Sequence, residues 1–361
     1  MSETVVVVGA GYGGTAVAKA LDDVADVVLV EPRDTFVHNI AALRGLVDPD
    51  WTDQLFHPYD RLLRRGRVVR DRAVRVDAAG VDLGSGDRIA ADYTVLATGA
   101  SYPFPAKTDT DDSATSKTRI RAAHAELAQA ENVLLLGAGP VGLELAGEIK
   151  AAWSGKSVTI VDPAAAIVPA YPDEFRAEVR RQLDDLGVEL VLGTSLSTNP
   201  PSAAGEAAPF TVLTESGREI TADIWFRCFG SAPATGYLGD DLAAARRGDG
   251  RLDVTLELRL PGQERVFAIG DITAVPEAKR ASAAGKHAEV VAANIRALIT
   301  GDGELAAYRA EGPGIALPLG PKGGASYSAE MGILDAETTS QLKGADLMVG
   351  RFAEALTAQD G

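Results

Sequence analysis

Two glycine motifs with the same spacing are the stretches of this sequence whose residue types suggest chemistry. Residues 9–14 read GAGYGG and residues 137–142 read GAGPVG, and both fit the pattern G-x-G-x-x-G. One glycine permits a tight turn from strand to helix, the next lets a pyrophosphate approach the backbone, and the last lets the helix pack closely on the strand. The helix N-terminus adds free amides and the positive end of its dipole. We call these motifs the first and second fingerprints. Their candidate ligand-binding glycines are Gly9, Gly11, Gly13, Gly14, Gly137, Gly139 and Gly142.

An acidic residue follows each fingerprint where a ribose would lie. Glu31 and Asp162 stand at the end of the next apolar run, where a carboxylate can accept hydrogen bonds from ribose hydroxyls. One isolated glycine motif is a weak signal, and a tight turn without a ligand is the alternative. Here both copies follow an apolar run, open a helical stretch and meet an acid. Two dinucleotide sites in one chain predict electron transfer between a bound flavin and a bound nicotinamide nucleotide.

Two other strand ends are candidates for the flavin site. VLATGA (95–100) ends in the turn Ala97, Thr98 and Gly99, which could close over the first fingerprint. VFAIGDIT (266–273) ends in Gly270 and Asp271. Asp271 could bind a ribitol hydroxyl, and the helix after it would direct its positive end at the flavin edge where negative charge grows on reduction. A common Gly-Asp turn without a ligand is the other interpretation.

The elements that position these turns follow from short apolar runs. Residues 4–8, 27–31, 133–136 and 157–161 predict buried parallel strands, joined in pairs by helices as two βαβ units. The stretch 101–118, rich in Pro, Ser, Thr and Asp, predicts a crossing between domains, and alanine-rich 282–300 predicts a long helix.

The predicted fold class is α/β, with two Rossmann-like dinucleotide-binding domains (FAD and NAD) and a small C-terminal α+β unit. The predicted domains are 1–108 with 245–300 for FAD, 109–244 for NAD(H), and 301–361 for the C-terminal unit.

Composition excludes several functions. The chain has 361 residues, more than one core usually supports, and a net charge of −16. No basic stripe could neutralise the phosphates of a nucleic acid. Cys228 is the only cysteine and the four histidines lie far apart, so we expect no disulfide and no metal site. The chain enters a strand almost at once and has no apolar run of about 18 residues, which predicts a cytoplasmic protein without a signal peptide or a transmembrane segment.

The sequence resembles the pyridine-nucleotide disulfide oxidoreductase superfamily. More narrowly, FVHNIAALR (36–44), ATGASYPFPAK (97–107) and GDITAVPEAKRASAAGKHAEVVAANI (270–295) are similar to the ferroptosis-suppressor branch of the apoptosis-inducing-factor family. The resemblance covers the chain through residue 300 and the remainder more loosely. It implies FAD at the first fingerprint with the ATG and GD turns, NAD(P)H at the second, and an FAD-dependent NAD(P)H oxidoreductase with a quinone-type acceptor. Further cofactor contacts are expected at Arg33, Val74 and Gly230.

The resemblance also suggests which residues act on the acceptor side. Disulfide reductases of the superfamily carry two cysteines in the segment equivalent to 36–45, and this chain has none there, which excludes dithiol chemistry and sulfide as a donor. Glu144 and Lys279 are the candidate catalytic residues. Glu144 would lie beside the nicotinamide and flavin, or it would only complement a helix dipole. Lys279 would pair with Glu144 or stabilise reduced flavin, or it would simply be solvated. His38 could approach the flavin ring, although such a histidine more often packs or caps.

The choice of cofactor and acceptor remains open at this stage. Asp162 would repel a 2′-phosphate and no arginine follows it in DPAAAIVPA, so NADH is predicted over NADPH, which stays possible. A ferredoxin or rubredoxin reductase, an NAD(H)-sensing flavoprotein that acts through a partner, and a flavin monooxygenase are the alternatives. The acidic charge disfavours the first of these. Four apolar residues near the C-terminus predict core or dimer packing, with peripheral membrane contact as the second interpretation; they are Leu347, Met348, Phe352 and Leu356.

Overall fold

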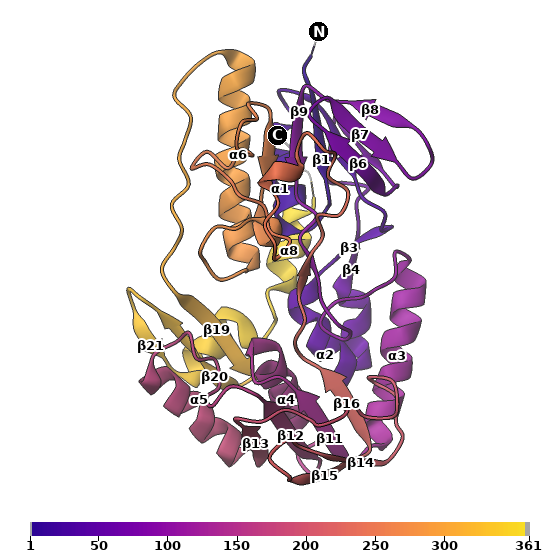
Figure 1. Cartoon of the computed structure of the whole chain (residues 1–361), viewed down its shortest axis with the longest axis vertical. Helices are drawn as coiled ribbons and strands as arrows, with labels where there is room; N and C mark the ends of the chain where they lie inside the picture. Colours follow the sequence, from indigo (N-terminus) through magenta and orange to yellow (C-terminus); the bar gives the residue numbers. More distant parts are fainter. Residues whose placement is uncertain (1, 358–361) are drawn as a thin grey trace.

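Two parallel sheets form the centres of two stacked domains in the computed structural model, which describes residues 2–357 (Figure 1). The first sheet has the order β18-β9-β1-β2-β5, and the second has the order β13-β12-β11-β16. The strands of the first sheet are β1 (Thr4–Val8), β2 (Asp26–Val30), β5 (Arg67–Val69), β9 (Tyr93–Leu96) and β18 (Val266–Ala268). Those of the second are β11 (Asn132–Leu136), β12 (Ser157–Asp162), β13 (Val188–Leu192) and β16 (Ile224–Arg227). The predicted α/β class with two Rossmann-like domains is confirmed.

The first sheet is covered by helices on one face and by a β-meander on the other. The helices are α1 (Tyr12–Leu21) and α6 (Ala281–Thr300), and the meander is β6 (Ala73–Asp77), β7 (Gly80–Leu83) and β8 (Arg88–Ala90). Alternate residues of β1 point to opposite faces, so Val5 and Val7 pack with α1 and α6 while Val6 and Val8 pack with β6 and β7. An uninterrupted valine run is therefore what a strand buried on both faces requires.

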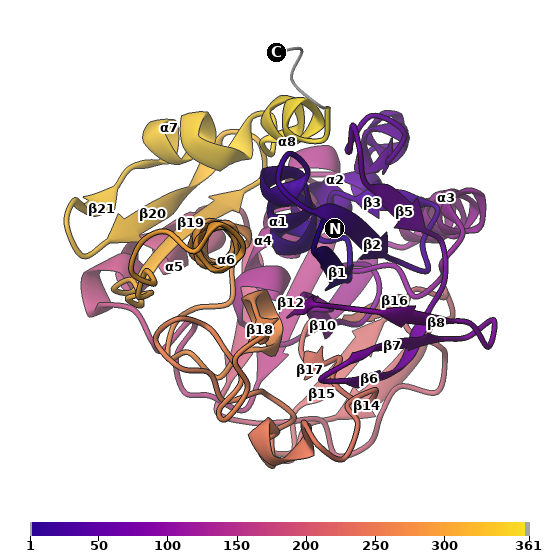
Figure 2. The same ribbon diagram turned by 90° about the horizontal axis from the view of Figure 1, so that it is seen from above.

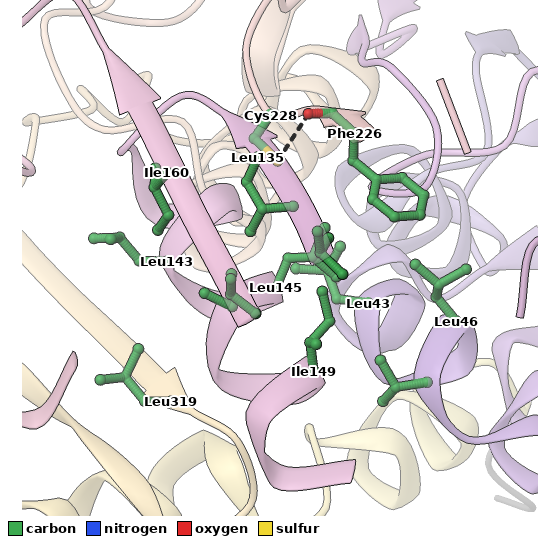
Figure 3. Close-up of a cluster of buried hydrophobic side chains, with 14 of the residues drawn as sticks. Leu43, Leu46, Leu135, Leu143, Leu145, Ile149, Ile160, Phe226, Cys228 and Leu319 are labelled. Atoms are coloured by element: carbon green, nitrogen blue, oxygen red, sulfur yellow. Dashed lines mark hydrogen bonds between the residues drawn. The ribbon is translucent and has the colours of Figure 1, made fainter. Parts of the chain in front are cut away.

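The second domain repeats this arrangement. Helix α4 (Pro140–Ala152) covers the face of β11 to which Val133 and Leu135 point. Figure 3 shows part of this core. Leu134 and Leu136 pack on the opposite face against the hairpin of β14 (Phe210–Leu213) and β15 (Glu219–Ala222). Helix α5 (Asp173–Asp185) connects β12 to β13.

The chain leaves the first domain by a route shorter than the sequence predicted. Helix α3 (Ser113–Gln129) begins inside the stretch 101–118, with the carboxylate of Asp112 accepting from the amide of Thr115 as its cap. The crossing is thus limited to 102–112. The predicted helix at 282–300 is confirmed, since α6 begins one residue earlier, with Val291 and Ile295 fully buried against α1.

Smaller elements complete the first domain, and some of them lie in the segment that leads back to it from the second domain. They are β3 (Thr35–Val37), η1 (Asn39–Ala41), α2 (Ala42–Val47), η2 (Pro49–Leu55), β4 (Phe56–Pro58), β10 (Ala100–Ser101), β17 (Ala232–Pro233), η3 (Ala243–Ala245) and η4 (Gly270–Ile272).

The C-terminal unit is a three-stranded antiparallel sheet with short helices, seen at one edge of the molecule in Figure 2. It contains β19 (Gly314–Leu319), β20 (Gly323–Ser328), β21 (Gly332–Leu334), α7 (Ala336–Thr339), the π-helical turn η5 (Ser340–Gly344) and α8 (Val349–Ala355). The sheet packs on α4 and α5 of the second domain, but α8 returns to the first domain, where Leu356 joins the core around α1.

Candidate dinucleotide sites

Both fingerprints form the same tight turn between a strand and a helix. Gly9 and Gly137 have φ angles of +101° and +116°, a region that favours glycine. A Cβ on Gly14 would lie 1.9 Å from the carbonyl oxygen of Gly9, and a Cβ on Gly142 would lie 1.9 Å from that of Gly137. These glycines are therefore required by the turn itself, whether or not a ligand binds.

The middle glycine of each fingerprint is different, because its outer side is open. A Cβ built on Gly11 or Gly139 meets no atom within 4 Å. Gly11 caps α1 and Gly139 caps α4, so each open position lies at a helix N-terminus with amides available for phosphate oxygens. Gly13 lies within α1, and a Cβ there would approach Ala284 of α6 to 3.0 Å. Its role in the structure is close packing of α1 on α6.

The two acids hold equivalent positions. One oxygen of Glu31 accepts from the amide of Ala10 at 2.7 Å, and one oxygen of Asp162 accepts from the amide of Ala138 at 2.7 Å. The other oxygen accepts from Arg33 N at 3.1 Å in the first site and from Ala164 N at 2.7 Å in the second. Each carboxylate is thus fixed beside its fingerprint before any ribose is bound.

The turn 97–99 has a counterpart in the second domain, of which the sequence analysis named only Gly230. The amide of Ala97 donates to Val8 O and the amide of Cys228 donates to Leu136 O, each at 2.8 Å beside a fingerprint strand. Gly99 and Gly230 follow two residues later, with φ angles of +64° and +102°. The signal was the repeated pattern VLATGA and FRCFGS after an apolar strand.

The strands that follow these two turns pair with each other. In β10 and β17, Ala100 lies opposite Pro233 and Ser101 opposite Ala232 in an antiparallel pair. The hydroxyl of Tyr102 also donates to Cys228 O at 2.7 Å. The end of the first site is therefore joined directly to the end of the second.

The Gly270–Asp271 turn lies next to the 97–99 turn, because β18 pairs with β9. Lys107 connects the two turns: its ammonium donates to Ala100 O at 2.7 Å and lies 3.8 Å from the carboxylate of Asp271. Burial lowers the pKa of Lys107, and the charge of Asp271 opposes that shift. Lys107 belongs to the stretch that resembles the family, but nothing in its sequence position predicted that it reaches Asp271.

Glu144 forms an ion pair that joins α4 to the C-terminal unit. Its Oε1 accepts from the ammonium of Lys343 at 2.7 Å, and 13 % of its side-chain surface is exposed. Burial raises the pKa of Glu144, Lys343 lowers it, and Glu148 one turn further on raises it again. The predicted alternative partner, Lys279, does not pair with Glu144; its ammonium donates to Val275 O at 2.8 Å.

A second buried pair lies beside the first on the same face of α4. The guanidinium of Arg44 donates to both oxygens of Glu148 at 3.0 and 2.8 Å, with 5 % of each side chain exposed. It also donates to the carbonyls of Gly344 and Ala345 at 2.7 and 2.9 Å. One side chain of α2 thus contacts α4 and the segment that carries Lys343.

His38 and Cys228 are packed within the protein. The Nε2 of His38 lies 2.8 Å from Leu347 O, and burial lowers the pKa of this fully buried ring to about 4. Cys228 is buried and its pKa is raised to about 12 by desolvation, so its thiol is not a nucleophile. Among residues 2–357, no three His, Cys, Asp or Glu side chains gather in a way that could hold a metal ion.

Three other candidates have less direct support. Arg33 Nη1 lies 3.6 Å from Glu31, and its Nε is buried without a hydrogen-bond partner in the described part of the chain. Gly230 lies at the end of the second site as noted above. Val74 lies on β6 with 52 % of its surface exposed, and its contact with a cofactor stays a prediction.

These features fit a dinucleotide at each fingerprint. Each site combines an open glycine at a helix N-terminus with a fixed carboxylate at the next strand end. At the first site the unpartnered Arg33 Nε supplies a donor, and the 97–99 and 270–271 turns lie at neighbouring strand ends.

Comparison with known proteins supports this geometry. Residues 3–288 match the family described as pyridine nucleotide-disulphide oxidoreductase. Ferroptosis suppressor protein 1 of Taeniopygia guttata is 33% identical over 81% of this chain and 80% of its own length. Apoptosis-inducing factor homolog B of Dictyostelium discoideum is 29% identical over 98% and 96%. The solved sulfide:quinone oxidoreductase of Aquifex aeolicus has the same fold, with a TM-score of 0.81 at 15% identity over 100% of this chain and 93% of that one.

The chain is therefore a flavoprotein of the two-dinucleotide class, an oxidoreductase that uses FAD and NAD(P)H. Within that class it belongs to the pyridine nucleotide-disulphide oxidoreductase family, in the branch of the apoptosis-inducing-factor homologues and ferroptosis suppressor protein 1. In the part of the chain from residue 2 to 357, no helix is both long and apolar enough to span a membrane.

Proposed function

We propose that this protein transfers a hydride from NADH to FAD and then passes two electrons to a quinone-type acceptor. The observation that carries the proposal is the buried Glu144–Lys343 pair near the start of α4, where Glu144 lies two residues beyond the second fingerprint. The chain's single thiol is buried and not nucleophilic, so an acceptor that needs paired cysteines is excluded.

Bound FAD supplies the centre that accepts a hydride and releases electrons. Glu31, the 97–99 turn and Asp271 would hold it, with its pyrophosphate at Gly11. Gly139 and Asp162 would hold NADH at the second site. These residues contribute by placing the two reacting rings in contact, which can account for most of the rate enhancement in such transfers.

The proton balance gives Glu144 a role. Reduction of a quinone to a hydroquinone takes two electrons and two protons, whereas a hydride brings two electrons and one proton. One further proton must come from solvent. A carboxyl whose pKa is raised by burial holds a proton more readily than an exposed glutamate does, and it can release that proton inside the site. After the proton has left, the ammonium of Lys343 would stabilise the ionised carboxylate of Glu144.

An anaerobic absorbance titration tests the proposal. NADH should bleach the flavin bands rapidly, and a water-soluble quinone should restore them. Slow bleaching with a lasting long-wavelength charge-transfer band and no response to quinone would instead support an NAD(H)-sensing protein. Reoxidation by ferredoxin but not by quinone would support a ferredoxin reductase.

The proposed preference for NADH depends on Asp162. Its carboxylate is held by two backbone amides, so it cannot turn away from a 2′-phosphate without losing both hydrogen bonds. We expect kcat/KM to be at least about tenfold higher with NADH than with NADPH, and Asp162→Ser to reduce that ratio. Equal or better use of NADPH by the wild-type protein would contradict this preference.

A further inference from the structure

A buried row of polar groups links the C-terminal segment to the Gly270–Asp271 turn. The amide of Gly270 donates to Nδ1 of His287 at 3.0 Å. The other ring nitrogen, Nε2, lies 2.8 Å from Oε1 of Glu277. The hydroxyl of Tyr308 donates to Oε2 of the same carboxylate at 2.6 Å. We call Tyr308, Glu277 and His287 the buried relay.

The positions of the hydrogens in the buried relay follow from its partners. A backbone amide can only donate, so Nδ1 of His287 must accept from Gly270. A neutral ring then carries its proton on Nε2, which faces Glu277. A doubly protonated ring would direct an N–H at the Gly270 N–H, and that contact would be lost. Burial lowers the pKa of His287 and therefore favours the neutral form.

The relay is shielded from solvent and packed tightly. Only 1 % of the His287 and Glu277 side chains is exposed, and Tyr308 is buried as well. The Tyr308 ring meets the His287 ring edge-on, with centroids 4.3 Å apart. A carboxylate and an imidazole are costly to bury without polar partners, and here Nε2 and Oε1 face each other at 2.8 Å but without the geometry of a hydrogen bond. None of the residues proposed above for catalysis explains why three such groups lie here.

Charged groups around the relay come from two segments. Lys279 and Asp271 influence His287 from the loop that precedes α6. Glu311 lies on the same segment as Tyr308, and its amide is 3.4 Å from Glu277 Oε2. The segment that leads from α6 to β19 is thus attached to the loop that carries Asp271.

We propose that His287 is a positioning residue for FAD, which holds the Gly270–Asp271 turn through Nδ1 while Glu277 and Tyr308 fix its ring. Gly270 has a φ of +72°, and only the bond to His287 restrains its amide. The proposal rests on the assignment of Asp271 to FAD, and it does not depend on the identity of the electron acceptor. The segment around Tyr308 would therefore control how long the flavin stays bound.

The test is the rate of FAD release from the holoprotein, followed by flavin fluorescence, with far-UV circular dichroism recorded in parallel. Tyr308→Phe removes one hydroxyl and keeps the ring. His287→Leu removes the acceptor for Gly270, whereas His287→Asn can place an oxygen near the position of Nδ1. We expect release to be about threefold to tenfold faster for Tyr308→Phe and faster still for His287→Leu, with His287→Asn closer to wild type.

Matched controls separate this role from a general loss of stability. Tyr327→Phe removes a hydroxyl from β20 instead and should leave the release rate unchanged. Lowering the pH should accelerate release more in wild type than in His287→Asn, because only the wild-type ring can gain the proton that opposes Gly270. A wild-type release rate in Tyr308→Phe, or equal acid acceleration in the two proteins, would overturn the proposal.

A further variant distinguishes failure of the proposal from failure of its premise. Asp271→Ala should release FAD faster with the relay intact. If it retains flavin as wild type does, then Asp271 does not bind FAD and the premise is wrong. If Asp271→Ala loses flavin and the relay variants do not, only the role of His287 is refuted.

Discussion

Gly11 and Gly14 lie three residues apart, but a side chain would have opposite consequences at the two positions. A Cβ on Gly11 points into open space, while a Cβ on Gly14 would collide with the carbonyl of Gly9. Gly11→Val should therefore fold normally and lose FAD, because its side chain would occupy the space of the pyrophosphate. Absorbance at the flavin bands, measured after purification, gives the flavin content.

Gly14→Val is the matched comparison. It should destabilise the first domain by about 3 kcal/mol or more, because backbone must move to make room. Chemical denaturation of the two variants as apoproteins would separate the effects. A Gly11→Val protein that retains full flavin would show that the first fingerprint has been misassigned.

The pKa of Glu144 provides a prediction about pH. Burial raises this pKa above the ordinary value for glutamate, and Lys343 opposes that shift. If the protonated carboxyl donates, the rate of flavin reoxidation by quinone should fall as pH rises through that pKa. Lys343→Met removes the opposing charge, so the fall should move to higher pH. Glu144→Gln should abolish this limb of the profile. Stopped-flow measurement of flavin reoxidation at a series of pH values would check this prediction. An unchanged pH profile in Glu144→Gln would contradict the role of Glu144 as proton donor.

What the sequence could predict at this scale depended on distance along the chain. The fingerprint glycines, Glu31 and Asp162 lie within one βαβ unit each, so their spacing alone reveals them. The partner of Glu144 could not be found in that way, because Lys343 is 199 residues away on a different unit. Lys279 was a plausible partner because it matches a lysine of the family motif and carries the right charge.

At the scale of elements, the position of α4 against β19 depends on a glycine, which has no side chain. A Cβ on Gly147 would lie 2.4 Å from the Cα of Leu319, so α4 and β19 touch backbone to backbone there. Gly147→Ala should therefore force α4 and β19 apart and destabilise the protein by about 1–3 kcal/mol. The same substitution at Gly285 in α6, where a Cβ meets nothing within 4 Å, should be neutral or stabilising. Thermal unfolding of both variants gives the comparison, and equal midpoints would contradict the contact.

The C-terminal stretch is interrupted in a way that its apolar pattern does not show. Residues 342–356 carry an apolar stripe, but Leu347 and Met348 have φ angles of +49° and +62° and break it into η5 and α8. Leu347 and Leu356 are buried in the cores of different domains, which confirms core packing for these two. A pattern of apolar residues cannot reveal such a break, because neither of the two residues with a positive φ is a glycine.

At the scale of the whole molecule, Arg44 holds the two domains and the C-terminal unit together. Its guanidinium contacts Glu148 of the second domain and the carbonyls of Gly344 and Ala345 at the end of η5. Arg44→Met should cost about 3–5 kcal/mol, because it leaves Glu148 buried without its partner. The double variant Arg44→Met with Glu148→Leu should recover much of that loss. Urea denaturation of the three proteins would check this, and a single variant as stable as wild type would contradict it.

The two-domain plan was predictable because each domain repeats one local pattern, whereas its assembly was not. Nothing in the apolar run of β18 shows that it belongs beside β9, on the far side of an entire inserted domain. The resemblance to a known family suggested the discontinuous first domain, and the pairing of Val266–Ala268 with Thr94–Leu96 shows the physical join. The exact domain limits stay a prediction.

The pairing of β18 with β9 has a consequence during synthesis, because β9 is made long before β18. Until β18 and α6 have been synthesised, β9 is an edge strand whose apolar residues lack both a neighbouring strand and part of their cover. The strands of the second sheet can pair during that interval, since they are continuous in sequence, but Leu317 and Leu319 of β19, which belong to the core around α4, are still missing. A chain released from a ribosome that stalls between residues 230 and 260 would therefore have an exposed sheet edge in the first domain and an uncovered face of α4 in the second, which makes it a substrate for chaperones or for pairing with another nascent copy.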